Sequence, residues 1–150
     1  MSARSYREVL WPTWWIWLIA LGFVGMLAVA FGAALGSEVG WGLAFAGGAI
    51  ILISFIGFSP RISVSDEGLQ VGHATLPRAA IGRVKALTAA ETKAARTEHY
   101  DASWYAVLRP ICAPTAVVIE VVDARDPHPA WIVTSRRPTK LAAALDSPHA

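Results

Sequence analysis

The residues of this chain with metal-ligand chemistry lie in one short stretch and at two distant histidines. Glu98, His99 and Asp101 bring carboxylate and imidazole groups together, and His73 and His128 are the further candidates. Metal sites hold their ligands on ordered elements at a consistent spacing, and this set matches no zinc or iron pattern. We therefore expect a solvated loop here, with no metal and no cofactor.

Nucleophilic and nucleotide chemistry have no recognisable motif in the chain. A hydrolase of the Ser-His-Asp type often carries its serine in a Gly-x-Ser-x-Gly turn, which the sequence lacks. Glycines such as Gly22 and Gly25 lie in an apolar stretch, where they serve helix packing rather than phosphate binding. The single Cys112 excludes an intrachain disulfide and argues against structural zinc. We expect no catalytic residue and no enzymatic activity.

Basic side chains are the remaining chemical candidate, as a predicted contact for an anion or a lipid headgroup. Arg136, Arg137 and Lys140 stand at the start of a predicted C-terminal helix, whose amino end also favours an anion. Arg61 follows the apolar part of the chain, and Arg109 joins the set through the fold resemblance given below. Each Lys or Arg near an anionic leaflet contributes about 1 kcal/mol of attraction. The alternative is that these charges are solvated or pair with aspartates, namely Asp101, Asp123 and Asp126.

Two long uncharged stretches precede all of these basic side chains in the sequence. From Val9 to Ser37 and from Val39 to Pro60 there is no charged residue, and Glu38 alone interrupts them. They predict membrane-spanning helices over 13–35 and 41–58, about 34 and 27 Å long, against a bilayer core of about 30 Å. A mean hydropathy of +0.45 agrees with this location. The alternative, a cleaved signal peptide, has an apolar region of only about 7 to 15 residues.

Aromatic and basic residues orient the two predicted spans. Indole rings prefer the membrane interface. The tryptophans expected there are Trp11, Trp14, Trp15, Trp17 and Trp41. Arg4 and Arg7 precede the first span and Arg61 follows the second, whereas the turn holds only Glu38. The positive-inside rule then predicts a multi-pass protein of the plasma membrane with both termini in the cytoplasm.

Small residues recur every four positions on both spans near the turn. They are Ala28, Gly32 and Gly36 on the first, and Gly40, Ala44 and Gly48 on the second. Such stripes let helix backbones approach closely in lipid. We expect them to face each other within one antiparallel hairpin. The alternative is that the same grooves pair two copies of the chain, so self-association stays open.

The chain divides into residues 1–60, a polar lead and the helical hairpin, and residues 61–150, a soluble domain. Alternating and β-branched residues predict strands in the second part. These cover 61–65, 69–73, 81–87, 104–108, 116–122 and 130–134. Thr88 and Glu91 have the spacing of a capping box, and Pro138 suits the first position of a closing helix. The expected fold class is α+β, a small antiparallel barrel or bent sheet capped by a C-terminal helix.

Several short motifs carry a resemblance that covers nearly the whole chain. They are Leu10-Trp11-Pro12 before the first span, Arg109-Pro110 before the long strand, and the run from Trp131 to Pro138. With the order of the elements, they resemble a family of small actinobacterial membrane proteins of unknown function. The soluble part is similar to bacterial pleckstrin-homology-like (PH-like) domains attached to membrane helices. The resemblance implies a fold and a location but no activity.

Two functions remain open at this point. In the first, the chain is a membrane-anchored binding or scaffolding module that presents an edge strand or groove to a protein partner near the bilayer. In the second, it is an accessory subunit of a larger membrane complex and the hairpin makes the contacts. An exposed apolar patch around Trp104, Tyr105 and Ile111 would favour the first, and one along the helices the second. A net charge of +2 with scattered basic residues does not indicate nucleic acid.

Overall fold

The structure, a computed structural model, describes residues 6–99 and 101–146 and divides into two compact units. The β unit holds residues 1–10 and 60–150, and the hairpin holds residues 11–59. The chain thus leaves the β unit after Leu10 and returns to it at Pro60. Arg4, which the orientation prediction uses, lies outside the described residues.

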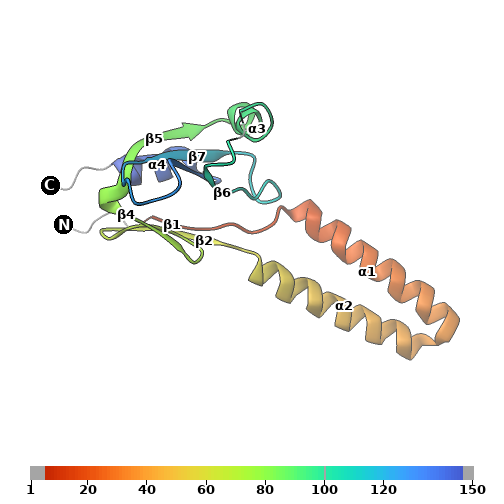
Figure 1. Ribbon diagram of the computed structural model, residues 1–150. Coiled ribbons are helices and arrows are strands. Elements are labelled where there is room, and N and C mark those ends of the chain that lie inside the picture. The colour runs from red at the N-terminus through yellow and green to blue at the C-terminus, as the bar shows by residue number, and fades with distance from the viewer. Residues whose placement is uncertain (1–5, 100, 147–150) are drawn as a thin grey trace. The chain divides into compact units, whose positions relative to one another are not determined.

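Two helices joined by a single residue make the hairpin (Figure 1). Helix α1 covers Trp14–Leu35 and helix α2 covers Ser37–Gly57, and both are long and apolar enough to cross a membrane. Between them Gly36 has a φ of 108°, a left-handed conformation that favours glycine. The second helix begins four residues earlier than the predicted start at Trp41, because Gly36 reverses the chain by itself. At 1.5 Å per residue α2 is therefore about 31 Å long.

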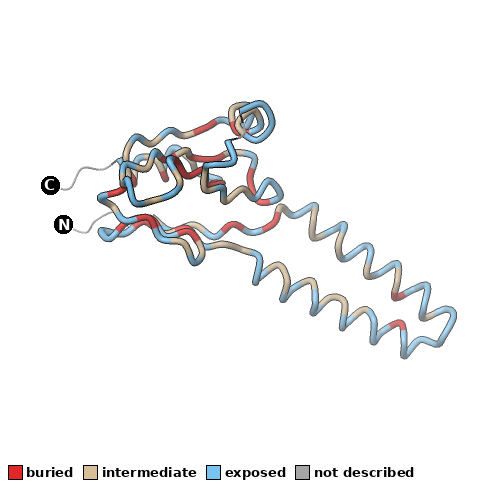
Figure 2. The backbone as a smooth tube through the Cα atoms, in the orientation of Figure 1, coloured by how far each residue is buried: buried red, intermediate tan, exposed pale blue. Residues whose placement is uncertain are grey.

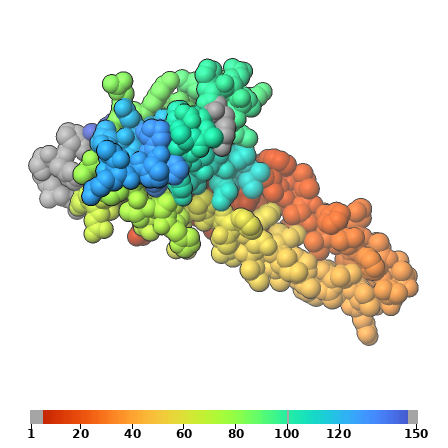
Figure 3. Space-filling view, viewed as in Figure 1, coloured from red at the N-terminus to blue at the C-terminus, as the bar shows by residue number. Residues whose placement is uncertain are grey.

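Glycine and alanine bring the two helices together at the turn end of the hairpin. A Cβ added to Gly40 would lie 2.8 Å from the Ala28 carbonyl oxygen and 3.0 Å from Gly32 Cα, so the backbones nearly touch. Figure 3 shows the helices in contact there. Ala28 and Gly40 are the buried residues of α1 and α2, and Figure 2 shows both helices as exposed or intermediate over most of their length. Close approach here depends on residues without large side chains.

The other small residues of the predicted stripes have different surroundings. Gly36 is the turn, and neither it nor Gly48 has a neighbour within 4 Å of an added Cβ. Ala44 is half-buried. In place of Gly48, the adjacent Gly47 faces α1, where an added Cβ would lie 2.7 Å from Val24 Cγ1. The four-residue repeat therefore holds near the turn and shifts by one residue farther along α2.

The first sheet of the β unit is an antiparallel meander in the order β1-β2-β3-β4. Its strands are β1 Tyr6–Val9, β2 Arg61–Ser65, β3 Gly68–Val71 and β4 Ala74–Pro77. Strands β2 and β3 confirm the strands predicted over 61–65 and 69–73. Strand β1 was not predicted, because the residues before Val9 read as a polar lead. Strand β4, which ends at Pro77, was not predicted either.

The second sheet has the order β5-β7-β8-β6. Its strands are β5 Ile81–Leu87, β6 Tyr105–Val107, β7 Ala116–Val121 and β8 Ala130–Thr134. The helical elements of the β unit are the 3-10 turn η1 Arg78–Ala80, α3 Ala89–Thr97 and α4 Pro138–Asp146. Strand β6 runs parallel to β8, which corrects the expectation of an antiparallel sheet. Thr88 and Glu91 form the predicted capping box at the start of α3.

Both sheets and α4 contribute to one hydrophobic core. Leu69 and Leu76 enter it from the first sheet, Ile119 and Val133 from the second, and Leu141 from α4. Burial of these side chains drives the β unit to fold. The α+β class is confirmed. The predicted barrel is not seen in the described part of the chain, where the strands form two separate ladders.

Candidate functional site: a basic corner at the hairpin attachment

The two points where the chain leaves and re-enters the β unit are bonded to each other. Strands β1 and β2 pair in the register Val9 to Arg61, and the Leu10 N–H donates to the Pro60 carbonyl at 3.1 Å. The Leu10 side chain is fully buried in the core. The helical hairpin is therefore an insertion between two paired antiparallel strands, held to the β unit at both ends.

A tight turn from Arg109 to Ala113 lies against this attachment. The N–H groups of Cys112 and Ala113 donate to the Arg109 carbonyl at 2.9 and 3.3 Å. The Arg109 N–H donates to Thr134 Oγ1 at 2.8 Å, and the Cys112 thiol donates to the Leu10 carbonyl at 3.4 Å. The turn is thus fixed both to strand β8 and to the end of β1.

Two arginines lie at this turn, and a third stands where the hairpin rejoins the β unit. The Arg136 Nε–H donates to the Cys112 carbonyl at 3.0 Å, so its guanidinium is held beside the turn. Burial raises the pKa of the Cys112 thiol, and the charges of Arg136 and Arg109 oppose that rise, which means that both cations lie close to Cys112. Arg61 follows Pro60 and is exposed on the outward-facing side of β2. We call Arg61, Arg109 and Arg136 the basic corner.

Arg137 and Lys140, the other two predicted anion contacts, stand at the start of α4. The Arg137 N–H donates to Ser135 Oγ at 3.1 Å. The positive charge of Arg137 partly opposes the rise in the pKa of Tyr6 in β1. Lys140 is exposed on the first turn of α4. The structure therefore places Arg109 and Arg136 at the turn, Arg61 next to the hairpin attachment, and Arg137 and Lys140 at the start of α4.

A carboxylate that the sequence analysis passed over ties β1 to the segment before α4. Glu8 accepts the Tyr6 hydroxyl at 2.6 Å, the Ser135 hydroxyl at 2.6 Å and the Arg136 N–H at 2.8 Å. Ser135 is fully buried. Burial alternates from Tyr6 to Val9 with Glu8 facing inward, and the sequence carried no signal for this, because an inward glutamate and an outward valine reverse the usual polarity of a strand. This network holds the backbone of Arg136 in place.

The same network changes the acidity of Tyr6. Burial and the hydrogen bond to Glu8 raise the pKa of the Tyr6 hydroxyl to about 12. The phenol is consequently neutral at physiological pH and acts as a hydrogen-bond donor. A neutral donor, a carboxylate acceptor and a buried serine make a structural clamp without a free nucleophile.

The predicted interfacial tryptophans lie near both ends of the hairpin's helices. Trp11, Trp14 and Trp15 are exposed before and at the start of α1. Trp17 is half-buried and meets Phe55 edge to face at a centroid distance of 4.6 Å. Trp41 is exposed on the second turn of α2 and stacks on Phe45 at 5.9 Å. Trp17 thus joins the helices, whereas the others face outward as interfacial anchors do.

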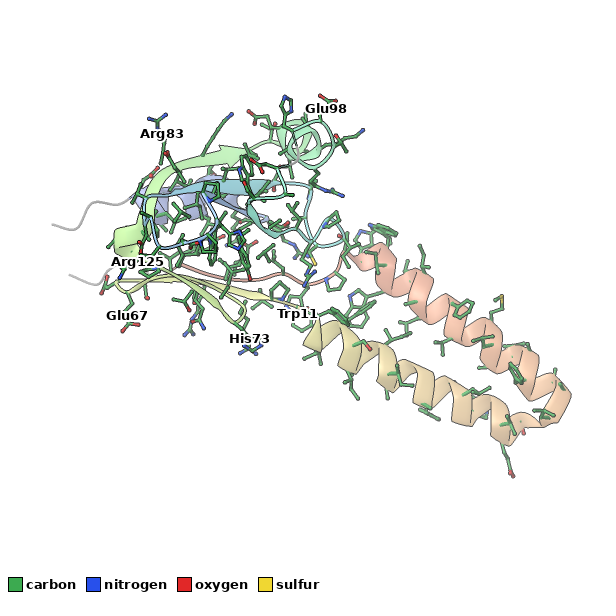
Figure 4. The ribbon with its side chains drawn as sticks, viewed as in Figure 1. Trp11, Glu67, His73, Arg83, Glu98 and Arg125 are labelled. Carbon is green, nitrogen blue, oxygen red and sulfur yellow. The ribbon has the colours of Figure 1, made fainter. Side chains whose placement is uncertain are left out.

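The metal-ligand candidates do not come together. Figure 4 shows His73 and Glu98 projecting outward on opposite sides of the β unit. The Asp101 carboxylate accepts the N–H and the hydroxyl of Ser103 at 2.8 and 2.6 Å, which lowers its pKa. His128 Nδ1 lies 2.8 Å from the Ser103 carbonyl. Within residues 6–99 and 101–146, no group of three or more His, Cys, Asp or Glu side chains is arranged to hold a metal ion.

The apolar patch that would mark a protein-binding surface is not continuous. Trp104 and Tyr105 are half-buried, and Tyr105 packs on Trp131 at a centroid distance of 4.4 Å. Ile111, at the tip of the 109–113 turn, is exposed. Of the three residues, only Ile111 therefore presents a large apolar surface to the outside, and it does so beside the basic corner.

A family model described as a protein of unknown function (DUF3093) matches residues 5–145. The match includes β1, both helices of the hairpin and α4 up to Leu145. No curated protein and no solved structure matches the chain.

Proposed function

Because the chain belongs to the family of proteins of unknown function DUF3093, whose description names no activity, we propose from the structure that it is a membrane-anchored binding or scaffolding module without catalytic activity. The observation that carries the proposal is the insertion of two apolar helices between paired strands β1 and β2. Large side chains such as Val29 and Phe45 point outward from these helices, as lipid contact requires.

The membrane location and orientation are part of this proposal. Both ends of the hairpin join the β unit, so a hairpin that crosses the bilayer keeps the whole β unit on one side. Basic residues lie on that side, at Arg7 and Arg61, and the turn carries only Glu38. The positive-inside rule then favours a plasma-membrane protein with the β unit and both termini in the cytoplasm.

The finer fold class also belongs to the proposal. We regard the β unit as a relative of the bacterial PH-like domains found in small actinobacterial membrane proteins. A four-stranded meander, a second sheet and a C-terminal helix around one core support this. The likeness concerns architecture and brings no activity with it.

Polar side chains of the β unit support a role without catalysis. Glu8 and Ser135 bond each other, Asp101 closes a turn on Ser103, and Asp123 pairs with Arg125 at 3.2 Å. A catalytic carboxylate or hydroxyl needs to meet a substrate. These groups instead hold strands and turns in place.

The edge strands limit how a protein partner binds. Strands β1 and β4 have four residues each, β4 ends in Pro77, and β6 has only three residues. Strand β5 is longer but displays Arg83 and Lys85, and Lys85 is 3.0 Å from Glu91. Charged and short edges discourage strand addition. The proposal therefore favours contact through side chains over an added strand.

The accessory-subunit function stays as a second candidate because of where the exposed apolar residues lie. In the described part of the β unit the exposed large hydrophobic side chains are Val9, Ile111 and Val122. The helices display many more, including Phe31, Trp41 and Ile53. Packing against other membrane helices accounts for this distribution as well as lipid does.

Photocrosslinking in cells distinguishes the two functions. A photoreactive residue is placed at His73, Thr75 or Val122 on the β unit, and at Val29 or Phe45 on the hairpin. The module function predicts a discrete protein adduct from the β unit positions. Adducts from the hairpin positions alone would establish the accessory subunit instead, and a chain without any protein adduct would contradict both.

A further inference from the structure

The turn from Arg109 to Ala113 has the composition of a membrane-surface contact. Cys112 and Ala113 are buried under it, whereas Arg109, Pro110 and Ile111 are exposed. Three hydrogen bonds to Thr134, Leu10 and Arg136 fix its backbone and thiol. A fixed turn presents its apolar tip with little loss of conformational freedom on binding.

Cations flank the exposed Ile111. Arg109 precedes it by two residues, and Arg136 is held beside Cys112 through its Nε. Within the part of the chain that the structure describes, ion pairs join Lys85 to Glu91 and Arg125 to Asp123, whereas Arg61 and Arg109 have no acidic partner. Guanidinium groups of this kind suit phosphate oxygens in geometry and charge.

Short segments of chain connect the residues beside this turn to the helices. The Cys112 thiol contacts Leu10, which is four residues before the start of α1 at Trp14. Pro60, bonded to Leu10, is three residues after the end of α2 at Gly57. Four residues span at most about 14 Å. Helices that cross a bilayer therefore tether Leu10, and the turn bonded to it, a short chain length from the headgroups.

We infer that the basic corner and Ile111 together bind the phosphate headgroups of anionic lipids in the leaflet next to the β unit. The inference rests on the proposed membrane anchorage and adds a ligand class to it. Arg61, Arg109 and Arg136 neutralise the phosphates, and Ile111 enters the interfacial region as apolar tips of peripheral proteins do. A soluble phosphate shares this chemistry but has no apolar part for Ile111 to meet.

The full-length chain in lipid nanodiscs tests the inference. A fluorophore is attached at Pro114→Cys, since the native Cys112 is buried, and it is quenched by lipids that carry a nitroxide on the headgroup. In discs of phosphatidylcholine with increasing phosphatidylglycerol, we expect quenching to rise with the anionic fraction and to fall again in high salt.

Substitutions identify the residues responsible. Arg109→Gln with Arg136→Gln should lower the equilibrium constant for binding of the turn to anionic discs about twenty-fivefold, since each arginine contributes about fivefold. The matched control, Arg83→Gln with Lys85→Gln on β5, should leave it unchanged. Ile111→Ser retains every charge and should weaken quenching at all lipid compositions. Hydrogen exchange of β8 verifies that each variant is folded.

The results that would contradict the lipid contact differ from those that would contradict the membrane anchorage. Quenching that is independent of phosphatidylglycerol, or equally dependent on it in the arginine variant, would overturn the inference. Inorganic phosphate that releases the turn from anionic discs at low millimolar concentration, with Ile111→Ser behaving like wild type, would assign the corner to a soluble anion instead. A chain that does not enter discs at all, as seen by size exclusion before any fluorescence is read, would overturn the membrane anchorage itself.

Discussion

The hairpin and the β unit use apolar residues in opposite ways. In the β unit, Leu69 and Leu141 are fully buried and the surface is polar. In the hairpin, large side chains such as Phe45 face outward, and the buried residues are the small ones, Ala28 and Gly40. Water drives the first arrangement by the hydrophobic effect. The second suits the proposed membrane location, where helices need close backbone contact because lipid gives apolar helices no such drive.

This difference shows what each unit is built to meet. A helix that exposes leucine and phenylalanine on most of its surface requires an apolar environment, whereas the β unit completes its own core. The two are joined at Leu10 and Pro60, where a backbone hydrogen bond of 3.1 Å closes the strand pair around the insertion. Glu8 bonds the segment before α4 to this joint. Cys112, in the segment before β7, bonds to Leu10.

Equal truncations in the two units should have very different effects. Leu69→Ala leaves a cavity in the β unit and should lower its free energy of unfolding by about 2–5 kcal/mol. Leu18→Ala on the outward face of α1 removes a similar side chain and should change it by less than about 0.5 kcal/mol. Hydrogen exchange of the β7 and β8 amides in detergent measures both. Similar losses of stability from the two substitutions would contradict this difference between the two units.

Within the hairpin, an added side chain should destabilise the helix contact only where a small residue is buried. Gly40→Leu places a side chain where the Ala28 carbonyl and Gly32 already lie, and should destabilise helix contact by about 1–3 kcal/mol. Gly48→Leu, with nothing within 4 Å of its Cβ, is the matched control. Disulfide crosslinking between cysteines introduced on α1 and α2 reports the approach. Undiminished crosslinking in Gly40→Leu would refute the backbone contact.

The joint between the units depends on polar contacts. Glu8→Ala leaves the buried Ser135 hydroxyl and the Arg136 N–H without their acceptor and should lower the stability of the β unit by about 1–3 kcal/mol. Glu67→Ala, in the exposed β2–β3 turn, should have little effect. Thermal unfolding followed by near-ultraviolet circular dichroism compares them. Equal melting temperatures would mean that Glu8 does not hold β1.

The smallest expected effect is a change with alkaline pH. The folded state raises the pKa of Tyr6 from about 10 to about 12, so it binds more protons than the unfolded state between these values. The contribution of Tyr6 is therefore complete below pH 10 and is lost as pH rises toward 12. Tyr6→Phe should reduce the loss of folding stability over this pH range, whereas Tyr105→Phe should show the same loss as the wild type. Denaturant unfolding at pH 9 and pH 11 decides between them.

Much of the fold was predictable from local patterns. The uncharged runs located both helices, β-branched alternation located β2, β3, β5, β7 and β8, and Thr88 with Glu91 located the start of α3. Strand β1 escaped because it is short and places Glu8 inward and Val9 outward, the reverse of the usual polarity. The parallel pairing of β6 with β8 depends on distant segments, which local periodicity does not encode.

The site was predictable only in part. Arg136 stood out through its place before a helix, but its contact with Cys112 and the buried joint at Leu10 arise from tertiary packing. The glycine repeat was clear, but the choice of Gly47 over Gly48 depends on how α2 rotates against Val24.

The most direct test of a membrane-crossing hairpin is the side of the membrane on which its turn and the β unit lie. Single cysteines replace Glu38 at the hairpin turn or His73 on the β unit, in a Cys112→Ala background, and intact cells are treated with a membrane-impermeant maleimide. The account predicts labelling at position 38 in intact cells and at position 73 only after permeabilisation. Labelling of both positions from the same side would contradict a membrane-crossing hairpin inserted between β1 and β2.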